Sequence, residues 1–205
     1  MELLKIITER RSIRKFRPDE VPDTLIRELL EAARLAPSGG NCQPWRFVII
    51  KSPSLKERLA EIVPQPFATK APLVIVVCVD KNAMSKEYLK RRTEELFMAR
   101  SFFAPPAGEF DFDAYTNQRP AGPALDQAYL NLNVAIAVDH LILRAVDLGL
   151  GACWVMQFDS KKVKKLLLLD DRYEPLVLLP VGFPDQMPKP RPRLNIKDIL
   201  IKEIN

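Results

Sequence analysis

Four residues near the N-terminus have the chemistry of a phosphate-binding site. The run ERRSIRKF contains Arg10, Arg11, Ser12 and Arg14 within five positions. Guanidinium groups and a hydroxyl hold a dianionic phosphate by charge-assisted hydrogen bonds. The same residues would also suit the basic C-terminal end of a helix, where cations interact favourably with the helix dipole. Taken alone, this run leaves both interpretations open.

Two further runs carry groups that would complete such a site. The segment APSGGNCQPWRF contains a loop of small and polar residues that leads into an apolar run. Glycines in a loop let the backbone approach a ligand closely. Near the C-terminus, GFPDQMPKPRPR supplies Arg191 and Arg193. Only folding could bring these two arginines to the first basic run, so a shared anion site is a prediction about tertiary structure.

Other catalytic groups are scarce in the sequence. His140 is the only histidine and lies in a strongly apolar stretch, which favours a core or interface position. Cys42, Cys78 and Cys153 form no CxxC pair, so we expect small buried or loop residues. The sequence has no HExxH or P-loop pattern, and we expect no metal site. Such scarcity is typical of an enzyme whose cofactor carries the reactive atoms.

Length and charge set the class of protein. With 205 residues and 47% hydrophobic content, the chain can bury a full core, and we expect a single domain over residues 1–205. Its 31 basic and 26 acidic residues are spread along the chain, giving a net charge of +5 without a basic tail. The N-terminus lacks the pattern of a secretory signal, and no apolar run has the length expected of a membrane span. We therefore expect a cytoplasmic protein that binds neither nucleic acid nor membrane.

Alternating helices and strands must position these groups. Apolar spacing predicts a helix over residues 2–10 with Leu3, Leu4, Ile6 and Ile7 facing inward. The continuous apolar run at 73–79 predicts a strand covered on both faces. Further strands are expected at 47–50, 152–156 and 176–181, and further helices at 23–35, 55–62, 85–100, 126–148 and 160–169.

The segment 101–125 has a different composition from its surroundings. It is rich in proline and aromatic residues and has no clear period. An irregular connection of this length is typical of a lid or of an arm onto a partner. A surface loop fixed by its own aromatic residues is the alternative.

The three runs, in this order, resemble the FMN-dependent nitroreductase family. The segment YLNLNVAIAVDHLILRAVDLGLGACWV is also similar to the family's long central helix and following strand, so the resemblance spans nearly the whole chain. It implies an α+β nitroreductase-like fold with a central, mostly antiparallel mixed sheet flanked by helices. It also implies an intertwined homodimer, in which central helices form the interface and the C-terminal extension adds a strand to the partner's sheet.

The resemblance also implies the roles of individual residues. The first basic run and the C-terminal arginines would bind the FMN phosphate and ribityl chain, the glycine-containing loop would reach the flavin of the other subunit, and the segment after the long helix would present backbone groups along the flavin's edge. The implied cofactor-binding residues are Arg10, Arg11, Ser12, Arg14, Pro37, Ser38, Gly39, Asn41, Trp154, Val155, Met156, Gln157, Arg191 and Arg193. Gln65 is a further candidate for the pyrimidine edge.

The implied activity needs no catalytic side chain, because flavin N5 carries the chemistry. NADH or NADPH would reduce tightly bound FMN, leave, and be replaced by a small oxidised acceptor such as a nitroaromatic or a quinone, in a ping-pong sequence. An apolar wall for this shared slot is expected from Phe102, Phe103, Phe110, Phe112 and Tyr115.

Three alternatives differ from this interpretation. The chain could bind or sense flavin without turnover, or be a specialised family member of the dehalogenating or flavin-processing type. It could also bind RNA through its arginines, which predicts aromatic residues interleaved with them. Here the aromatic residues cluster in 102–115, away from ERRSIRKF, which disfavours RNA binding.

Overall fold

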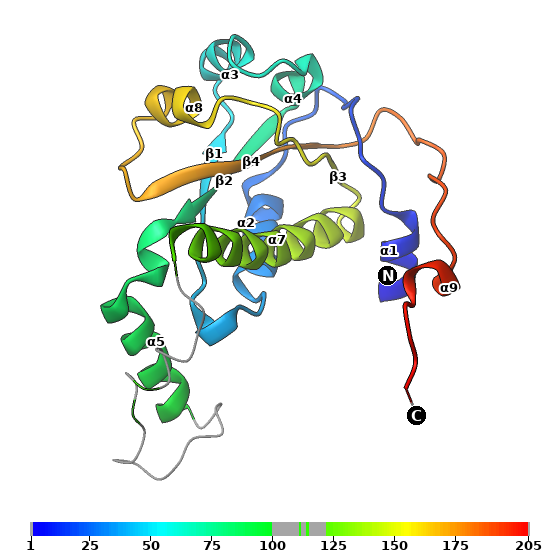
Figure 1. The fold of residues 1–205 in the computed structure, drawn as a ribbon. Helices are drawn as coiled ribbons and strands as arrows, with labels where there is room; N and C mark the ends of the chain where they lie inside the picture. The colour runs from blue at the N-terminus through cyan, green and yellow to red at the C-terminus, as the bar shows by residue number, and fades with distance from the viewer. Residues whose placement is uncertain (1, 100–110, 112–113, 115–121, 205) are drawn as a thin grey trace.

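A four-stranded antiparallel sheet forms the centre of the molecule. The structure is a computed structural model that describes residues 2–99, 111, 114 and 122–204. The strands lie in the order β1-β2-β4-β3 (Figure 1). They are β1 (Trp45–Ile50), β2 (Leu73–Asp80), β3 (Gly151–Ala152) and β4 (Tyr173–Gly182). A parallel bridge joins Ser12 to Ala152 beside β3. The expected α+β fold with a mostly antiparallel mixed sheet is confirmed.

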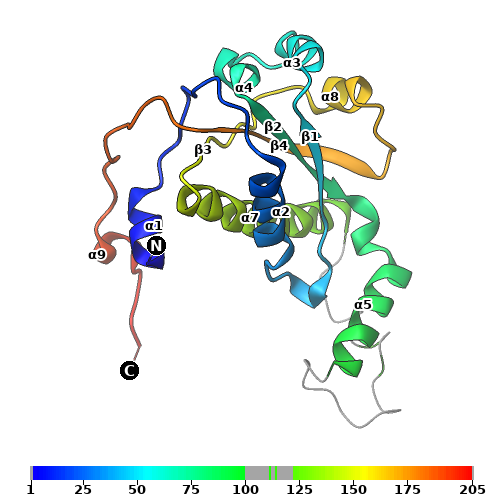
Figure 2. The ribbon, with the colours of Figure 1, turned by 180° about the vertical axis from the view of Figure 1, so that it is seen from behind.

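Helices cover both faces of this sheet (Figures 1 and 2). One face is covered by α2 (Asp23–Arg34) and α7 (Pro123–Asp147), and the other by α3 (Pro53–Ala60), α4 (Pro66–Lys70) and α8 (Ser160–Leu166). The remaining elements are α1 (Leu3–Glu9), α5 (Lys86–Met98), α9 (Ile196–Ile199) and the 3-10 turns η1 (Gly39–Asn41) and η2 (Lys81–Met84).

Strand β2 is buried on both faces, as its continuous apolar run predicts. Residues at alternate positions point to opposite sides of a strand. Ile75 and Val77 accordingly belong to the core cluster that includes α2 and α7, whereas Val74 and Val76 belong to the cluster under α3, α4 and α8. All eight residues of β2 are buried.

The long central helix α7 lies below the sheet in Figure 1. Among the described residues, α7 is the one helix long and apolar enough to cross a membrane. Its buried face, which includes Val134, Val138 and Leu141, packs against α2 and the sheet. A core helix passes the same test of length and composition, so the finding adds little to the case for a membrane span.

The first helix is present, but the face predicted to point inward is mostly exposed, so that part of the prediction was wrong. Only Ile6 of α1 is buried, whereas Leu3, Leu4 and Ile7 are 62%, 65% and 48% exposed. The helical spacing alone cannot tell which neighbour covers an apolar stripe. Further exposed apolar side chains follow near the C-terminus, at Leu194, Ile196, Ile199, Leu200, Ile201 and Ile204. Exposed apolar side chains that lie together are typical of an interaction site.

Gly151 lets Ile13, within the first basic run, pack closely against β3. A Cβ atom at this position would lie 2.5 Å from Cγ1 and 2.8 Å from Cβ of Ile13, which is itself 4% exposed. We expect Gly151→Ala to lower the free energy of unfolding by about 1–3 kcal/mol, because overpacking forces the backbone apart. Urea unfolding of the protein without cofactor measures this loss. A variant as stable as the wild type would contradict the close packing.

Candidate functional site

Main-chain hydrogen bonds hold the N-terminal basic run beside the chain that follows β4. Ile13 N donates to Ala152 O at 3.0 Å, and Arg17 N donates to Phe183 O at 2.9 Å. Asp185 N donates to Lys15 O at 3.0 Å. In both ribbon views the N-terminal chain and the chain leading to α9 run along the same side of the molecule (Figures 1 and 2). The two basic runs are therefore neighbours in space.

The two runs enclose one cleft of about 350 Å³, which we call the arginine cleft. It is lined by Ile7, Thr8, Arg10, Arg11, Ser12, Arg14, Pro188, Lys189, Pro190, Arg191 and Arg193. The lining contains six cationic side chains and no carboxylate. Such a concentration of one charge favours a bound anion, because like charges repel one another when nothing neutralises them.

The arginines of this cleft differ in how they are held. Arg11 donates from Nε to Pro188 O at 3.2 Å and from Nη1 to the carbonyls of Thr8 and Arg10 at 2.7 and 2.8 Å, so it also ties the two runs together. Arg14 lies 5.7 Å from the centre of the Phe67 ring. Among the described residues, no carboxylate pairs with the cleft's arginines, which leaves their charge for a ligand.

Cys153 lies close to the same cleft. The thiol is 3% exposed, and burial raises its pKa, while the charges of Arg14 and Arg191 and a hydrogen bond with Ser12 act in the opposite direction. Burial also raises the pKa of Cys78 to about 12. All three cysteines are buried, as expected, and these two are protonated near neutral pH.

The segment after β3 alternates between the core and the surface. Val155 is 4% exposed, and its N–H donates to Leu178 O at 3.0 Å. Trp154 and Met156 are 36% and 57% exposed, so their side chains lie at the surface. The Gln157 Oε1 atom accepts from Nε2 of Gln65 at 2.9 Å. The expected strand at 152–156 thus shortens to β3 and a single bridge at Val155.

The predicted glycine loop, residues 37–43, is tightly turned. Gly40, Asn41 and Gln43 have φ values of 56°, 51° and 41°. The Gly39 N–H donates to Oδ1 of the buried Asn133 at 2.8 Å, and a Cβ at Gly39 would lie 1.8 Å from the Tyr129 hydroxyl oxygen. A side chain at Gly39 would require the Tyr129 side chain to move, so glycine allows the loop to approach α7 closely.

Within one chain the glycine loop contacts the middle of α7, whereas the arginine cleft lies near the C-terminal end of this helix. Asn133 binds the loop, whereas Val146 shares a small hollow with Arg11. The helix between these two residues is roughly 20 Å long at about 1.5 Å per residue. Figures 1 and 2 likewise place α1 and α9 at one end of the molecule and α5, which contacts η1, at the other. One chain therefore does not bring the loop to the cleft.

Several predicted and several unpredicted residues complete this description. Phe102, Phe103, Phe110, Phe112 and Tyr115 lie outside the described residues, as does most of the 101–125 segment. His140 is partly buried in α7, and the described residues contain no cluster suited to a metal.

Lys189 and Gln186 were not predicted. In the amide orientation that satisfies both its atoms, Gln186 accepts from Arg14 N at 2.8 Å, a role that its sequence position does not signal.

Comparison with known proteins decides the family. The family model described as the Nitroreductase family matches residues 7–183 of this chain. The chain belongs to the nitroreductase family. The match includes the first basic run and the glycine loop, and it ends before Arg191 and Arg193. The arginine cleft thus joins the nitroreductase core to a C-terminal segment beyond the matched region.

Individual relatives match most of the chain. An NADH dehydrogenase from Thermus thermophilus is 29% identical over 204 residues, which cover 94% of this chain and 92% of that protein. A nitroreductase family protein from Streptococcus pneumoniae has a solved structure with a TM-score of 0.79 at 26% identity, covering 98% of this chain and 100% of that one. A candidate nitroreductase from Exiguobacterium sibiricum, solved in complex with FMN, has the same fold, with a TM-score of 0.84 at 24% identity and coverage of 99% and 98%.

Proposed function

We propose that the protein is an FMN-dependent oxidoreductase that takes electrons from NADH or NADPH and reduces a small oxidised acceptor, such as a nitroaromatic or a quinone. The observation that carries this proposal is the arginine cleft, whose six cations come from both ends of the chain. Membership of the nitroreductase family and the relative described as an NADH dehydrogenase support the same reaction class.

The arginine cleft fits the phosphate of FMN in its charge and its donors. Arg10, Arg14, Arg191 and Arg193 would donate to the phosphate oxygens, and the Ser12 hydroxyl would add a neutral donor. Arg11 would have fewer donors for the phosphate than the other arginines, because its Nε and Nη1 already donate to carbonyls. Nη2 is then the Arg11 group left to a ligand, and the side chain chiefly shapes the cleft.

The residues that follow β3 would lie along the ring. Ser12, which lines the arginine cleft, forms a β-bridge with Ala152. The exposed side chains of Trp154 and Met156 follow Ala152 by two and four residues, which places them close to the cleft along the chain. Gln65 would accept at the pyrimidine edge, since its Nε2 already donates to Gln157 and its Oε1 has no partner among the described residues. When bound, FMN supplies the hydride-accepting and hydride-donating atom of the reaction.

A second copy of the chain would complete the site. Within one chain the stretch of α7 between the glycine loop and the arginine cleft is roughly 20 Å long at about 1.5 Å per residue, so the loop would serve the flavin from a partner subunit. The exposed apolar side chains on α1, on α7 and in the C-terminal segment, Leu3, Leu4, Leu132 and Ile201 among them, provide a surface for such a homodimer. Dimer formation would therefore be a condition for catalysis.

Anaerobic absorbance spectroscopy tests this function. Protein loaded with FMN should lose its flavin absorbance when NADH or NADPH is added and regain it when a quinone or nitroaromatic follows. The nucleotide should leave before the acceptor binds, so that the two are never bound at the same time. Protein that binds FMN but is not reduced by either nucleotide would be a flavin-binding protein without turnover. Protein that stays colourless after incubation with FMN would contradict the proposal.

A further inference from the structure

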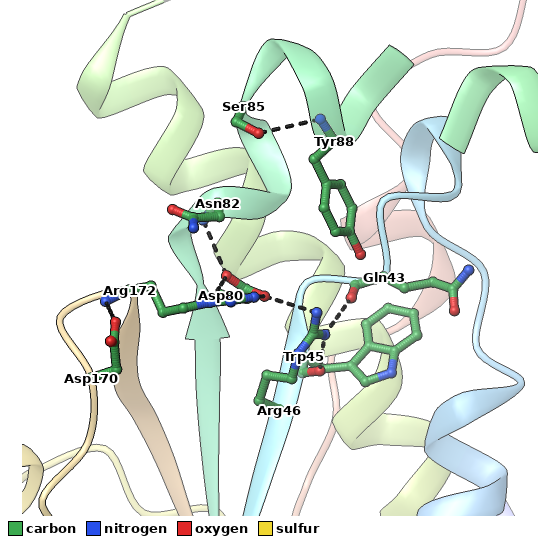
Figure 3. A network of polar contacts seen from close by, with 9 residues as sticks. All are labelled: Gln43, Trp45, Arg46, Asp80, Asn82, Ser85, Tyr88, Asp170 and Arg172. Atoms are coloured by element: carbon green, nitrogen blue, oxygen red, sulfur yellow. Dashed lines mark hydrogen bonds and ion pairs between the residues drawn. The ribbon is translucent and has the colours of Figure 1, made fainter. Parts of the chain in front are cut away.

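A fully buried carboxylate stands at the end of β2. Asp80 is 0% exposed and lies between two arginines from different elements (Figure 3). Its Oδ2 contacts Nη2 of Arg46 at 2.8 Å and Nη2 of Arg172 at 2.6 Å, and its Oδ1 accepts from Asn82 N at 3.1 Å and Arg172 Nε at 3.2 Å. A buried charge with several good partners is fixed in position. Asp80 therefore holds both arginine side chains in place, and with them any other group to which these arginines donate.

Arg46 connects Asp80 to the glycine loop. Its Nη2 pairs with Asp80, while its Nη1 donates to Gln43 O at 2.9 Å and to Trp45 O at 2.7 Å. Figure 3 shows the Arg46 guanidinium between Asp80 and the backbone of Gln43. The planar guanidinium can hold both partners at once in a fixed geometry. The last residue of the glycine loop is therefore tied to the buried end of β2.

The shape of the glycine loop needs such ties. Asn41 and Gln43 are non-glycine residues with left-handed φ values, which persist only when surrounding contacts impose them. Asn133 holds Gly39 from α7, and Arg92 Nε donates to Asn41 O at 2.9 Å from α5. Arg46 supplies the third tie, at the end of the loop that enters β1.

Arg172 offers an internal comparison. It binds the same carboxylate through two of its nitrogens, and its side chain is 37% exposed, as is that of Arg46. Its backbone N–H donates to Asp170 at 2.8 Å, and its guanidinium lies 4.8 Å from the Tyr173 ring centre. None of its interactions described above reaches residues 37–43. The two arginines share Asp80 but differ in their access to the loop.

We propose that Arg46 is a positioning residue that links Asp80 to the Gln43 carbonyl and so fixes the shape in which the glycine loop meets the flavin of the partner subunit. The proposal rests on the proposed function for the role of the loop. Arg46 itself need not touch the cofactor. Its effect passes through the backbone of Gln43.

Hydrogen exchange and FMN titration of Arg46→Gln, Arg46→Lys and Arg172→Gln test the proposal. Amides of the loop are internally bonded, for example Gln43 N to Ser38 Oγ at 2.9 Å, and should exchange slowly in the wild type. Arg46→Gln should speed their exchange and raise the Kd for FMN, each by about tenfold or more, since one charged hydrogen bond is lost. Arg46→Lys should recover part of both losses, because an ammonium keeps the charge and can donate to a carbonyl but lacks the planar fork of the guanidinium.

The comparison with Arg172→Gln separates positioning from stability. This variant should lower the melting temperature as Arg46→Gln does, while loop exchange and FMN affinity stay near wild type. Equal effects of Arg46→Gln and Arg172→Gln on both readouts, in a wild type that binds FMN, would overturn the positioning role and leave the proposed function intact. A wild type that binds no FMN would instead overturn the proposed function, and with it the loop's role toward a flavin.

Discussion

Replacing Arg14 and Arg193 together with alanine should raise the Kd for FMN by about 100-fold to 10,000-fold. Each arginine would give the phosphate at least one charged hydrogen bond, worth about 1.5–3 kcal/mol, and a tenfold change in Kd corresponds to about 1.4 kcal/mol. The two residues come from opposite ends of the chain and line the same cleft. Fluorescence titration of the apoprotein with FMN measures the loss.

A matched control removes the same charge from the same two segments outside the cleft. Arg17 pairs with Asp19 at 3.4 Å, Lys197 is exposed in α9, and neither lines the arginine cleft. Arg17→Ala with Lys197→Ala should therefore leave FMN affinity within a few-fold of wild type. If both double variants lost affinity equally, the effect would come from overall charge and the specific phosphate site would be disproved.

Replacing Leu132 with glutamate should give a monomer that releases FMN. Leu132 is 64% exposed on α7, in the helix expected to form the dimer interface. Burying a leucine contributes about 1.5–3 kcal/mol, and a buried unpaired carboxylate adds a larger cost. The monomer would lose the partner's glycine loop, and we expect the Kd for FMN to rise at least about tenfold, the equivalent of about 1.4 kcal/mol. Analytical ultracentrifugation and FMN titration follow the two changes.

Leu168→Glu is the matched control for this second variant. Leu168 is 90% exposed just after α8, on the opposite face of the sheet from α7. The same substitution there should change neither the mass in solution nor FMN affinity. A Leu132→Glu monomer that retained FMN as tightly as the wild type would show that the loop of the partner is not needed.

The sequence analysis predicted which basic residues line the arginine cleft, but not which of them already donate to carbonyls within the chain. The two runs at residues 10–14 and 191–193 were assigned to one anion site from their residue types together with the family resemblance, and in the structure both line one cleft. The sequence gives no sign that Arg11 is largely engaged with carbonyls, because that depends on where the Pro188 carbonyl lies in space. Their function toward FMN stays a prediction until the titrations are done.

Periodicity predicted elements but not what lies against them. The apolar run of β2 correctly indicated burial on two faces. The stripe on α1 was misassigned, because an apolar spacing looks the same whether the covering surface belongs to the same chain or to another. The tie between Arg46 and Asp80 joins separate strands through side chains, so no local pattern in the sequence signals it.

The affinity of the wild-type apoprotein for FMN compared with riboflavin tests the central claim most directly. The two ligands share the ring and the ribityl chain and differ in the phosphate that the arginine cleft is proposed to hold. We predict that FMN binds at least about 1,000-fold more tightly, from two or more charged hydrogen bonds. Equal affinities for the two ligands would contradict the assignment of the cleft to the phosphate.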